Sequence, residues 1–347
     1  MPISAQDLQM LGKSSLEKFL RNKPVSQIGV NTPLLDKLMS GRKLFLGAKE
    51  NVVGQLRTNY GTNFQWGRGE KPIVFNTRDT LEQTFFPWGR CNDGFRIAHD
   101  TLFSNGIKVR EGKGQGVKYT LEKDESIQLT NLIVEQQDAF VTGFKERLSI
   151  ELHRDGSADV DSVAGLDSLI SLTPNTGIVG GIDRAAKPYW RNNVATGLTA
   201  STILDAMEAT WRQCHRNGGA PDFILAGSAF ADLYRKSLVL TQNTEAGRAS
   251  TIDAGVGTGV NNGLFYKGVP IVWDPQFYDL DQLDSPAIPW EKRCYFINSK
   301  HIKLYDDEMD IVSPDRPHDI LSLYQMVILR LALTTDRANS HAVLAIA

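Results

Sequence analysis

The sequence has few cysteines, and their spacing excludes the two structural uses that cysteine usually has. There are three, Cys91, Cys214 and Cys294, an odd number spread along the chain without a CxxC pair. A disulfide framework needs paired cysteines, and a structural zinc site needs ligands at short spacings. We therefore expect neither feature, and we expect the chain to fold in a reducing cytoplasm.

Long apolar runs and an excess of positive charge are also missing. No stretch approaches the roughly 18 apolar residues of a membrane helix, and residues 1–10 lack the charged and apolar regions of a signal peptide. We therefore expect neither a membrane span nor export by a signal peptide. Because 38 basic residues face 40 acidic ones, no overall basic field favours phosphates, and direct DNA binding is not expected as the main role.

Residue patterns typical of catalysis are absent from the sequence as well. It has no GxxxxGK[ST] phosphate loop, and none of its six histidines has another at the i, i+4 spacing of a helical metal site. Ser228 lies in Gly-Ser-Ala between an expected strand and helix, but Phe230 replaces the second glycine of a hydrolase elbow, which favours a helix N-cap. We expect no catalytic, cofactor-binding or metal-binding residue, and a structural protein rather than an enzyme.

Charge is distributed unevenly along the chain. Residues 1–57 contain nine basic and four acidic residues, a net charge of +5, which leaves −7 on the rest of the chain. A basic arm lying on an acidic neighbour would have this asymmetry, and so would an ordinary solvated amphipathic segment. Charge alone leaves both interpretations open.

A segment rich in aromatic residues follows. Residues 59–93 contain many glycines and turn formers, and short β-prone stretches at 64–66, 73–75 and 84–88 predict an extended hairpin. Its aromatic residues are Tyr60, Phe64, Trp66, Phe75, Phe85, Phe86 and Trp88. Because a two-stranded ribbon cannot bury so many rings by itself, they contact either the rest of the same chain or another subunit.

The longest periodic segment predicts a helix over residues 122–153. Its apolar residues keep to one stripe at steps of four or seven, it contains no proline, and Asp155-Gly156 offers a stop. At about 1.5 Å per residue the helix would be about 48 Å long. So long a helix is unusual in a mixed domain and suggests a spine across a flattened subunit.

Shorter helices and strands alternate after this spine. The elements expected in this α/β module are a helix at 199–216, a buried strand at 222–226, a helix at 228–236 and a strand at 269–273. Four β-prone runs are found at 294–298, 302–305, 321–333 and 342–346. We expect these runs to form one terminal sheet, with a helix such as the spine covering one of its faces.

Several short motifs resemble one protein family and occur in the order found there. They are Gly165-Leu-Asp-Ser-Leu-Ile170, Gly180-Gly-Ile-Asp-Arg184, Pro188-Tyr-Trp-Arg191, Gly219-Ala-Pro-Asp-Phe-Ile224 and, with lower specificity, Trp66-Gly-Arg-Gly69, Lys267-Gly-Val-Pro-Ile-Val-Trp-Asp274 and Tyr295-Phe-Ile-Asn-Ser-Lys-His-Ile302. The sequence thereby resembles the major capsid proteins of tailed bacteriophages (Caudoviricetes), which have the Hong Kong 97 fold. The resemblance extends over nearly the whole chain.

The resemblance implies an α+β subunit with four parts. These are an N-terminal arm (1–57), an extended hairpin loop (58–93), a peripheral domain with the spine helix 122–153 and the terminal sheet (94–158 and 291–347), and an α/β axial domain (159–290).

The resemblance also implies a function. A major capsid protein self-assembles as pentamers and hexamers into the icosahedral head shell, which encloses double-stranded DNA that the subunit contacts only indirectly. The implied partners are a scaffolding protein, a portal and a decoration protein, with assembly in the cytoplasm of the host bacterium and a final location in the virion capsid. An encapsulin-like compartment that holds enzyme cargo is the alternative with the same fold.

Five residues of the hairpin are the expected intersubunit contacts, because aromatic and arginine side chains dominate the energetics of interfaces. Trp66, Phe85 and Trp88 would anchor the hairpin on a neighbouring subunit, and Arg68 and Arg90 would pair with acidic groups there. Replacing Trp88 with alanine should then leave a folded subunit that forms particles poorly.

Some members of this family join a hairpin lysine covalently to an asparagine of a neighbour, assisted by a carboxylate. Lys71 and Asn339 are the positions that this chain offers, but no acidic residue follows Asp336. We therefore expect no such cross-link, and denaturing gels of mature particles should contain no ladder.

Overall fold

The computed structural model describes residues 31–44, 50–58, 63–67, 69, 72, 75, 80–98, 123–216, 219–242, 254–256, 264–312 and 322–347. The described residues form two compact units. The smaller unit takes its residues from 91–148 and 309–329, and the larger from 31–90, 149–308 and 330–347.

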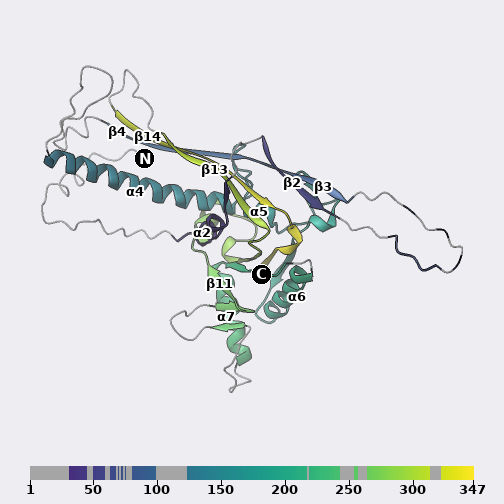
Figure 1. Ribbon diagram of the computed structural model, residues 1–347. Helices are drawn as coiled ribbons and strands as arrows, with labels where there is room; N and C mark the ends of the chain where they lie inside the picture. Colours follow the sequence, from purple (N-terminus) through teal and green to yellow (C-terminus); the bar gives the residue numbers. More distant parts are fainter. Residues whose placement is uncertain are drawn as a thin grey trace. The chain divides into compact units, whose positions relative to one another are not determined.

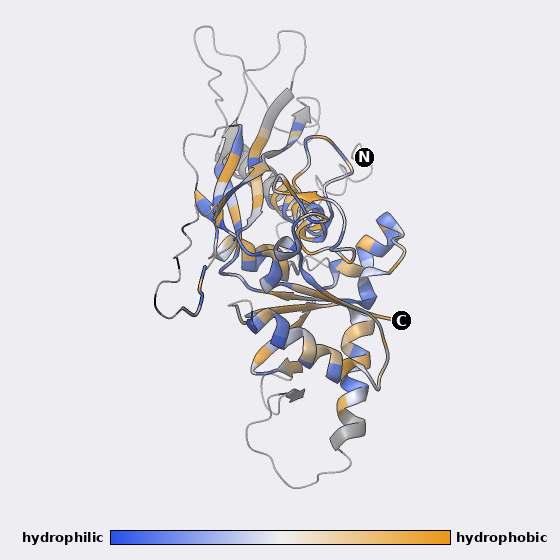
Figure 2. Ribbon diagram, turned by 90° about the vertical axis from the view of Figure 1, so that its right-hand side faces the viewer, coloured by the Kyte–Doolittle hydropathy of each residue, from blue (hydrophilic) through white to orange (hydrophobic). Residues whose placement is uncertain are grey.

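A seven-stranded mixed sheet forms the core of the larger unit (Figure 1), with strand order β7-β15-β12-β8-β11-β10-β9. Its strands are β7 (Asn193–Leu198), β8 (Phe223–Ala226), β9 (Ala254–Val256), β10 (Leu264–Tyr266), β11 (Val269–Trp273), β12 (Arg293–Ile297) and β15 (Ala342–Ile346). β8 and β12 are buried on both faces, and the strands near the C-terminus are coloured as hydrophobic in Figure 2. Such strands need a cover on each side.

Two amphipathic helices cover one face of this sheet. In α6 (Ile203–Arg216) the buried residues recur every three or four positions, at Ile203, Met207, Thr210 and Cys214. α7 (Ser228–Gln242) adds Phe230, Tyr234 and Leu238, and the strands add Ile224, Cys294, Phe296 and Leu344. Full burial of an Ile, Leu, Met or Phe side chain stabilises the fold by about 2 kcal/mol. The hydroxyl of Ser228, which we expected to cap α7, instead donates to Glu291 Oε1 at 2.9 Å.

Aromatic rings and one ion pair cover the opposite face of the sheet. Tyr295 of β12 lies 6.1 Å from the ring of Phe277 in α8 (Gln276–Asp284) and 6.2 Å from that of Trp290 in η2 (Trp290–Lys292). Arg293 stacks 4.2 Å above Trp290 and donates to Asp167 of α5 (Leu166–Leu169) at 3.1 Å. Burial raises the pKa of the Asp167 carboxyl, and the Arg293 guanidinium offsets part of that rise.

A second sheet has the strand order β1-β13-β14-β4. Its strands are β1 (Lys43–Leu44), β4 (Gly89–Ala98), β13 (Ile302–Val312) and β14 (Ser322–Thr335). The expectation of one terminal sheet is therefore wrong, because β12 and β15 belong to the seven-stranded sheet. β12 pairs with β8 along one edge and with β15 along the other, and both partners come from distant parts of the sequence.

Two helices, α4 and α2, lie in the segments that we expected to form the spine and the arm. The long helix expected over residues 122–153 is confirmed as α4, which extends from Lys123 to His153. Within the expected arm, α2 (Pro33–Ser40) buries Leu34, Leu35 and Leu38, so this segment packs on its own chain. Residues 1–30 and 45–49 of the arm lie outside the described residues, and the four-part division of the chain stays a prediction.

His341 gives the core a dependence on pH. The side chain is buried, and its Nδ1 accepts the backbone N–H of Asn298 at 3.1 Å. Burial lowers the pKa of His341 from 6.5 to about 3. Between these values the unfolded chain binds a proton that the folded chain excludes, so the free energy of unfolding should fall by up to about 1.4 kcal/mol per pH unit of acidification.

Denaturant titrations between pH 7 and pH 5 would test this expectation. In His341→Asn the amide oxygen can still accept the Asn298 N–H, whereas nothing at the position titrates. We expect a shallower fall in stability on acidification than in the parent chain. Parallel stability curves for the two chains would contradict the assignment to His341.

Candidate intersubunit surface

The base of the expected hairpin is a two-stranded antiparallel ribbon. β2 (Asn51–Arg57) pairs with β3 (Leu81–Pro87) along its whole length, and Thr58 N–H continues the pairing by donating to Thr80 O at 3.0 Å. The first strand of the ribbon thus lies in the segment that we had assigned to the arm. Residues 64–66, which we predicted as a strand, are described without regular secondary structure, and 73–74 lie outside the described part of the chain.

The two faces of the ribbon have different surroundings. Alternate residues are buried on one face, where Val52 lies opposite Phe86 and Gly54 lies opposite Thr84. The other face carries Val53 (53% exposed), Phe85 (44%) and Leu81 (61%) beside polar residues. The buried face packs against the same chain, and the other face leaves apolar surface in contact with solvent.

Segment 177–191 supports the buried face. It contains the strands β5 (Ile178–Val179) and β6 (Ile182–Asp183) and the helical turn η1 (Pro188–Trp190). The N–H of Phe85 donates to Gly180 O at 2.9 Å, and Lys187 Nζ lies 3.1 Å from a carboxylate oxygen of Glu82. Part of the hairpin therefore contacts its own chain, since Phe86 is buried there. Other rings of the hairpin are exposed and remain available to a neighbouring subunit.

The five predicted contact residues differ in their surroundings. Trp66 is 85% exposed and meets the ring of Phe64 edge-on at 5.2 Å. Phe85 is partly exposed on the outer face, Trp88 is half-buried, and Arg90 is exposed while its backbone N–H donates to Asp161 O. Arg68 lies outside the described residues. The intersubunit roles of all five stay a prediction, and Trp66 is best placed for one.

Three exposed residues extend this surface beyond those selected from the sequence. Val53 and Leu81 lie on the outer face of the ribbon, and Phe75 is 87% exposed. Val53 was missed because it lies in the basic segment assigned to the arm. Alternation in Asn51–Arg57 was the available signal, but Gly54 interrupts it.

Lys71 and Asn339 are the two positions at which a cross-link was considered and not expected. Lys71 lies outside the described residues, and Asn339 is part of η3 (Ala338–Ser340), where its backbone oxygen accepts the Asn193 side chain at 2.9 Å. The absence of a cross-link stays a prediction.

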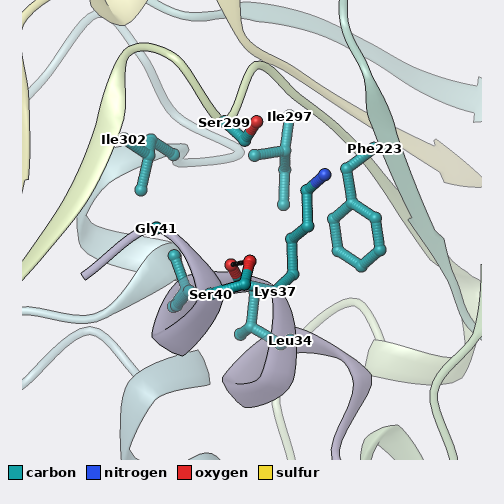
Figure 3. Close-up of a pocket in the computed structure, with 9 residues that line it drawn as sticks. Leu34, Lys37, Ser40, Gly41, Phe223, Ile297, Ser299 and Ile302 are labelled. Carbon is teal, nitrogen blue, oxygen red and sulfur yellow. Dashed lines mark hydrogen bonds between the residues drawn. The ribbon is translucent and has the colours of Figure 1, made fainter.

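A small hollow lies where α2 packs on the ends of β8 and β12 (Figure 3). Its lining is mostly apolar, with Leu34, Phe223, Ile297 and Ile302 among the residues, and Lys37 points across it toward the Phe223 ring. The hydroxyls of its two serines donate to groups elsewhere, Ser40 to Lys37 O at 2.7 Å and Ser299 to the Asp222 carboxylate. The hollow is a packing gap beside α2.

One pair of a histidine and a carboxylate lies in the core. His153 Nδ1 donates to Ser149 O at 2.7 Å, and its Nε2 lies 3.0 Å from Asp274 Oδ2. Asp274 also accepts the N–H of Gln276, so the group ties the end of α4 to the start of α8. Both side chains have no exposed surface, which leaves no access for a substrate. No local pattern indicates this pairing, because 121 residues separate the partners.

Comparisons with solved structures identify the fold. A chain of the cyanophage A-1(L) capsid asymmetric unit is 17% identical, covers 95% of this chain and 97% of its own length, and superposes with a TM-score of 0.64. A chain of the capsid of Myoviridae phage XM1 is 9% identical, covers 94% and 96%, and has a TM-score of 0.55. The chain has the Hong Kong 97-type capsid fold. The expected α+β class is thereby confirmed.

A third capsid structure has the same fold. In the capsid of a native GTA particle, a chain 10% identical covers 95% of this chain and 96% of its own length, with a TM-score of 0.51. No family model and no curated protein matches the sequence. The relationship is therefore one of Hong Kong 97-type architecture at low sequence identity.

Neither a metal site nor a membrane span is found in the described residues. Within them, no three His, Cys, Asp or Glu side chains are grouped so that they could hold a metal ion. In the same part of the chain, no helix combines the length and the apolar character of a membrane span.

Proposed function

We propose that this chain is the major capsid protein of a tailed bacteriophage and self-assembles into the icosahedral shell of the head. The observation that carries the proposal is the similarity over nearly the full length of both chains to subunits of the cyanophage A-1(L) and phage XM1 capsids. A match over this length includes the hairpin and the long helix as well as the core. A match limited to a core domain would include neither of them.

The exposed ribbon supports this proposal physically. Trp66 and Phe75 expose most of their ring surface, and the outer face of the ribbon adds Val53, Leu81 and Phe85. Val53 and Phe85 are cross-strand partners on this face, and exposed apolar surface of this kind marks interaction sites. Permanent assemblies typically bury more than about 2,000 Å² per interface, and an outstretched ribbon provides such area without enlarging the core.

The subunits assemble as pentamers and hexamers, and the enclosed double-stranded DNA is held by the shell as a whole. The near balance of 38 basic and 40 acidic residues fits a wall that contains DNA without binding it tightly. A scaffolding protein, a portal and a decoration protein are the partners that we propose for this role. Assembly takes place in the host cytoplasm and the product is the virion capsid.

Electron microscopy of the purified chain, expressed with and without its scaffolding protein, tests the proposal. We expect closed shells of uniform size, and nuclease-resistant double-stranded DNA inside particles from infected cells. A folded enzyme as the content would instead indicate the encapsulin-like alternative. If the chain stays a small soluble oligomer under all these conditions, the proposal is wrong.

A further inference from the structure

Segment 177–191 forms a platform along the edge of β3 that does not pair with β2. Its two short strands β5 and β6 pair through Ile178 with Asp183 and Val179 with Ile182. The indole N–H of Trp190, a buried residue, donates to Val179 O at 2.9 Å. These contacts lie within segment 177–191 and hold it together without any residue of the ribbon.

Two arginines brace the platform from inside. Arg191 donates through Nε to Arg184 O at 2.6 Å and through Nη2 to Ala185 O at 2.7 Å. Arg184 is 1% exposed, its Nη2 donates to Leu169 O, and burial lowers its pKa to about 10. Burying a guanidinium costs free energy unless hydrogen bonds compensate. The bond to Leu169 O, outside the segment, ties the platform to α5, whereas Arg184 Nε is buried without a partner among the described residues. The motifs Gly180–Arg184 and Pro188–Arg191 thus encode one rigid element.

Two glycines let the ribbon approach this element closely. Gly180 and Gly181 have φ angles of +59° and +78°, which favour glycine. A Cβ on Gly180 would lie 2.8 Å from the ring of Phe86, and a Cβ on Gly181 would lie 3.2 Å from that of Phe85. The two glycines therefore lie against rings on opposite faces of β3, Gly180 against Phe86 and Gly181 against Phe85, and larger residues there would push the ribbon away.

A polar contact completes the attachment at the outer end of β3. One carboxylate oxygen of Glu82 accepts the hydroxyl of Tyr189, and the other lies 3.1 Å from Lys187 Nζ. Phe85 N–H and Glu82 thus connect the same strand to the platform at two points, three residues apart. Two separated attachments fix the direction of a strand, whereas one would let it pivot.

From these contacts we infer that the 177–191 platform sets the direction in which the ribbon leaves the subunit, with Glu82 as the positioning residue. The direction decides where the exposed rings at Trp66 and Phe75 arrive on a neighbour. This consequence for the shell rests on the proposed function, whereas the direction of the ribbon in the single subunit does not.

Distances between two spin labels in the unassembled full-length chain measure this direction. Val53→Cys places one label on the outer face of β2, and Lys236→Cys places the other at an exposed position of α7. Cys91 is partly exposed and is replaced by serine, whereas Cys214 and Cys294 are buried and stay unlabelled. The parent chain should give a narrow distance distribution.

Glu82→Ala and Lys187→Met should broaden the distribution and shift its mean, with an unchanged melting temperature. Glu82→Gln should give a smaller shift, because the amide still accepts the Tyr189 hydroxyl while the charge pair is lost. Gln83→Ala, on the exposed face of the same strand, is the matched control and should leave the distribution unchanged.

A broad distribution in the parent chain, or an unchanged one in both Glu82→Ala and Lys187→Met, would overturn the inference. If Glu82→Ala fails to fold, Lys187→Met still decides, because Lys187 is 45% exposed and tolerates truncation. The readout needs no shells, so failure of the inference is distinct from failure of the capsid proposal.

Discussion

Replacing Gly165 with alanine is expected to destabilise the subunit by about 3 kcal/mol or more, the upper end of the usual cost of overpacking. A Cβ at this position would lie 2.3 Å from Arg154 O and 2.5 Å from Leu152 O. Both atoms belong to the backbone at the end of α4, so no side-chain rotation can relieve the contact. Gly165 is also the N-cap residue of α5, and its oxygen accepts the N–H of Leu169. The clash would therefore separate two packed helices.

Gly143→Ala provides a control with the opposite expected sign. Gly143 lies within α4, is exposed, and has no atom within 4 Å of a built Cβ. Alanine is more favourable than glycine inside a helix by about 1 kcal/mol, so this variant should be more stable than the parent. Denaturant titration of both purified subunits measures the difference. Equal stability of Gly165→Ala and the parent would show that the backbone at the α4–α5 junction can shift to make room for a Cβ, and would contradict the prediction.

Gly165 also illustrates what the sequence could not provide. The motif Gly165–Ile170 was recognisable by resemblance, but the reason for its glycine is the approach of residues 152 and 154 in three dimensions. Gly54 is similar, since a Cβ there would lie 2.6 Å from Thr84 Oγ1 across the ribbon. Local pattern indicates a turn or a flexible position at a glycine, whereas close approach to a distant partner has no local signature.

Helices with a strong period were predictable, and the grouping of strands was not. α4 differs from its expected start by one residue, because a long apolar stripe is a local property. α6 begins four residues after the expected position, since Thr199 and Thr202 form a turn of their own before it. β12 is buried on both faces and therefore lacks the alternation that would assign it to one sheet.

The sequence was sufficient to predict that aromatic residues are exposed on the candidate surface, but only partly sufficient to predict which ones. An excess of rings over what a ribbon can bury indicated exposed aromatic residues, and Trp66 and Phe75 are exposed. The number of rings could not tell that Phe86 would turn inward and Phe85 outward. That choice depends on the register between β2 and β3, which shifts every side chain to the other face if it slips by one residue.

Trp66→Ala is expected to prevent the formation of closed shells while the subunit stays folded. Trp66 is 85% exposed, and truncation of surface residues usually changes stability by less than about 0.5 kcal/mol. An interface tryptophan commonly contributes about 2 kcal/mol or more to binding, which corresponds to a roughly 30-fold weaker contact. Because every subunit of a closed shell repeats this contact, the loss accumulates over the particle.

Circular dichroism, melting temperature and particle yield by electron microscopy would be measured together for Trp66→Ala and a matched variant. Trp273→Ala removes a 54% exposed tryptophan from β11, outside the ribbon, by the same change. We expect parent-like melting for Trp66→Ala with few or no shells, and substantially more shells for Trp273→Ala. Normal shells from Trp66→Ala would remove the ribbon from the assembly contacts. Equal losses in both variants would show that exposed rings matter generally and that the ribbon has no special part.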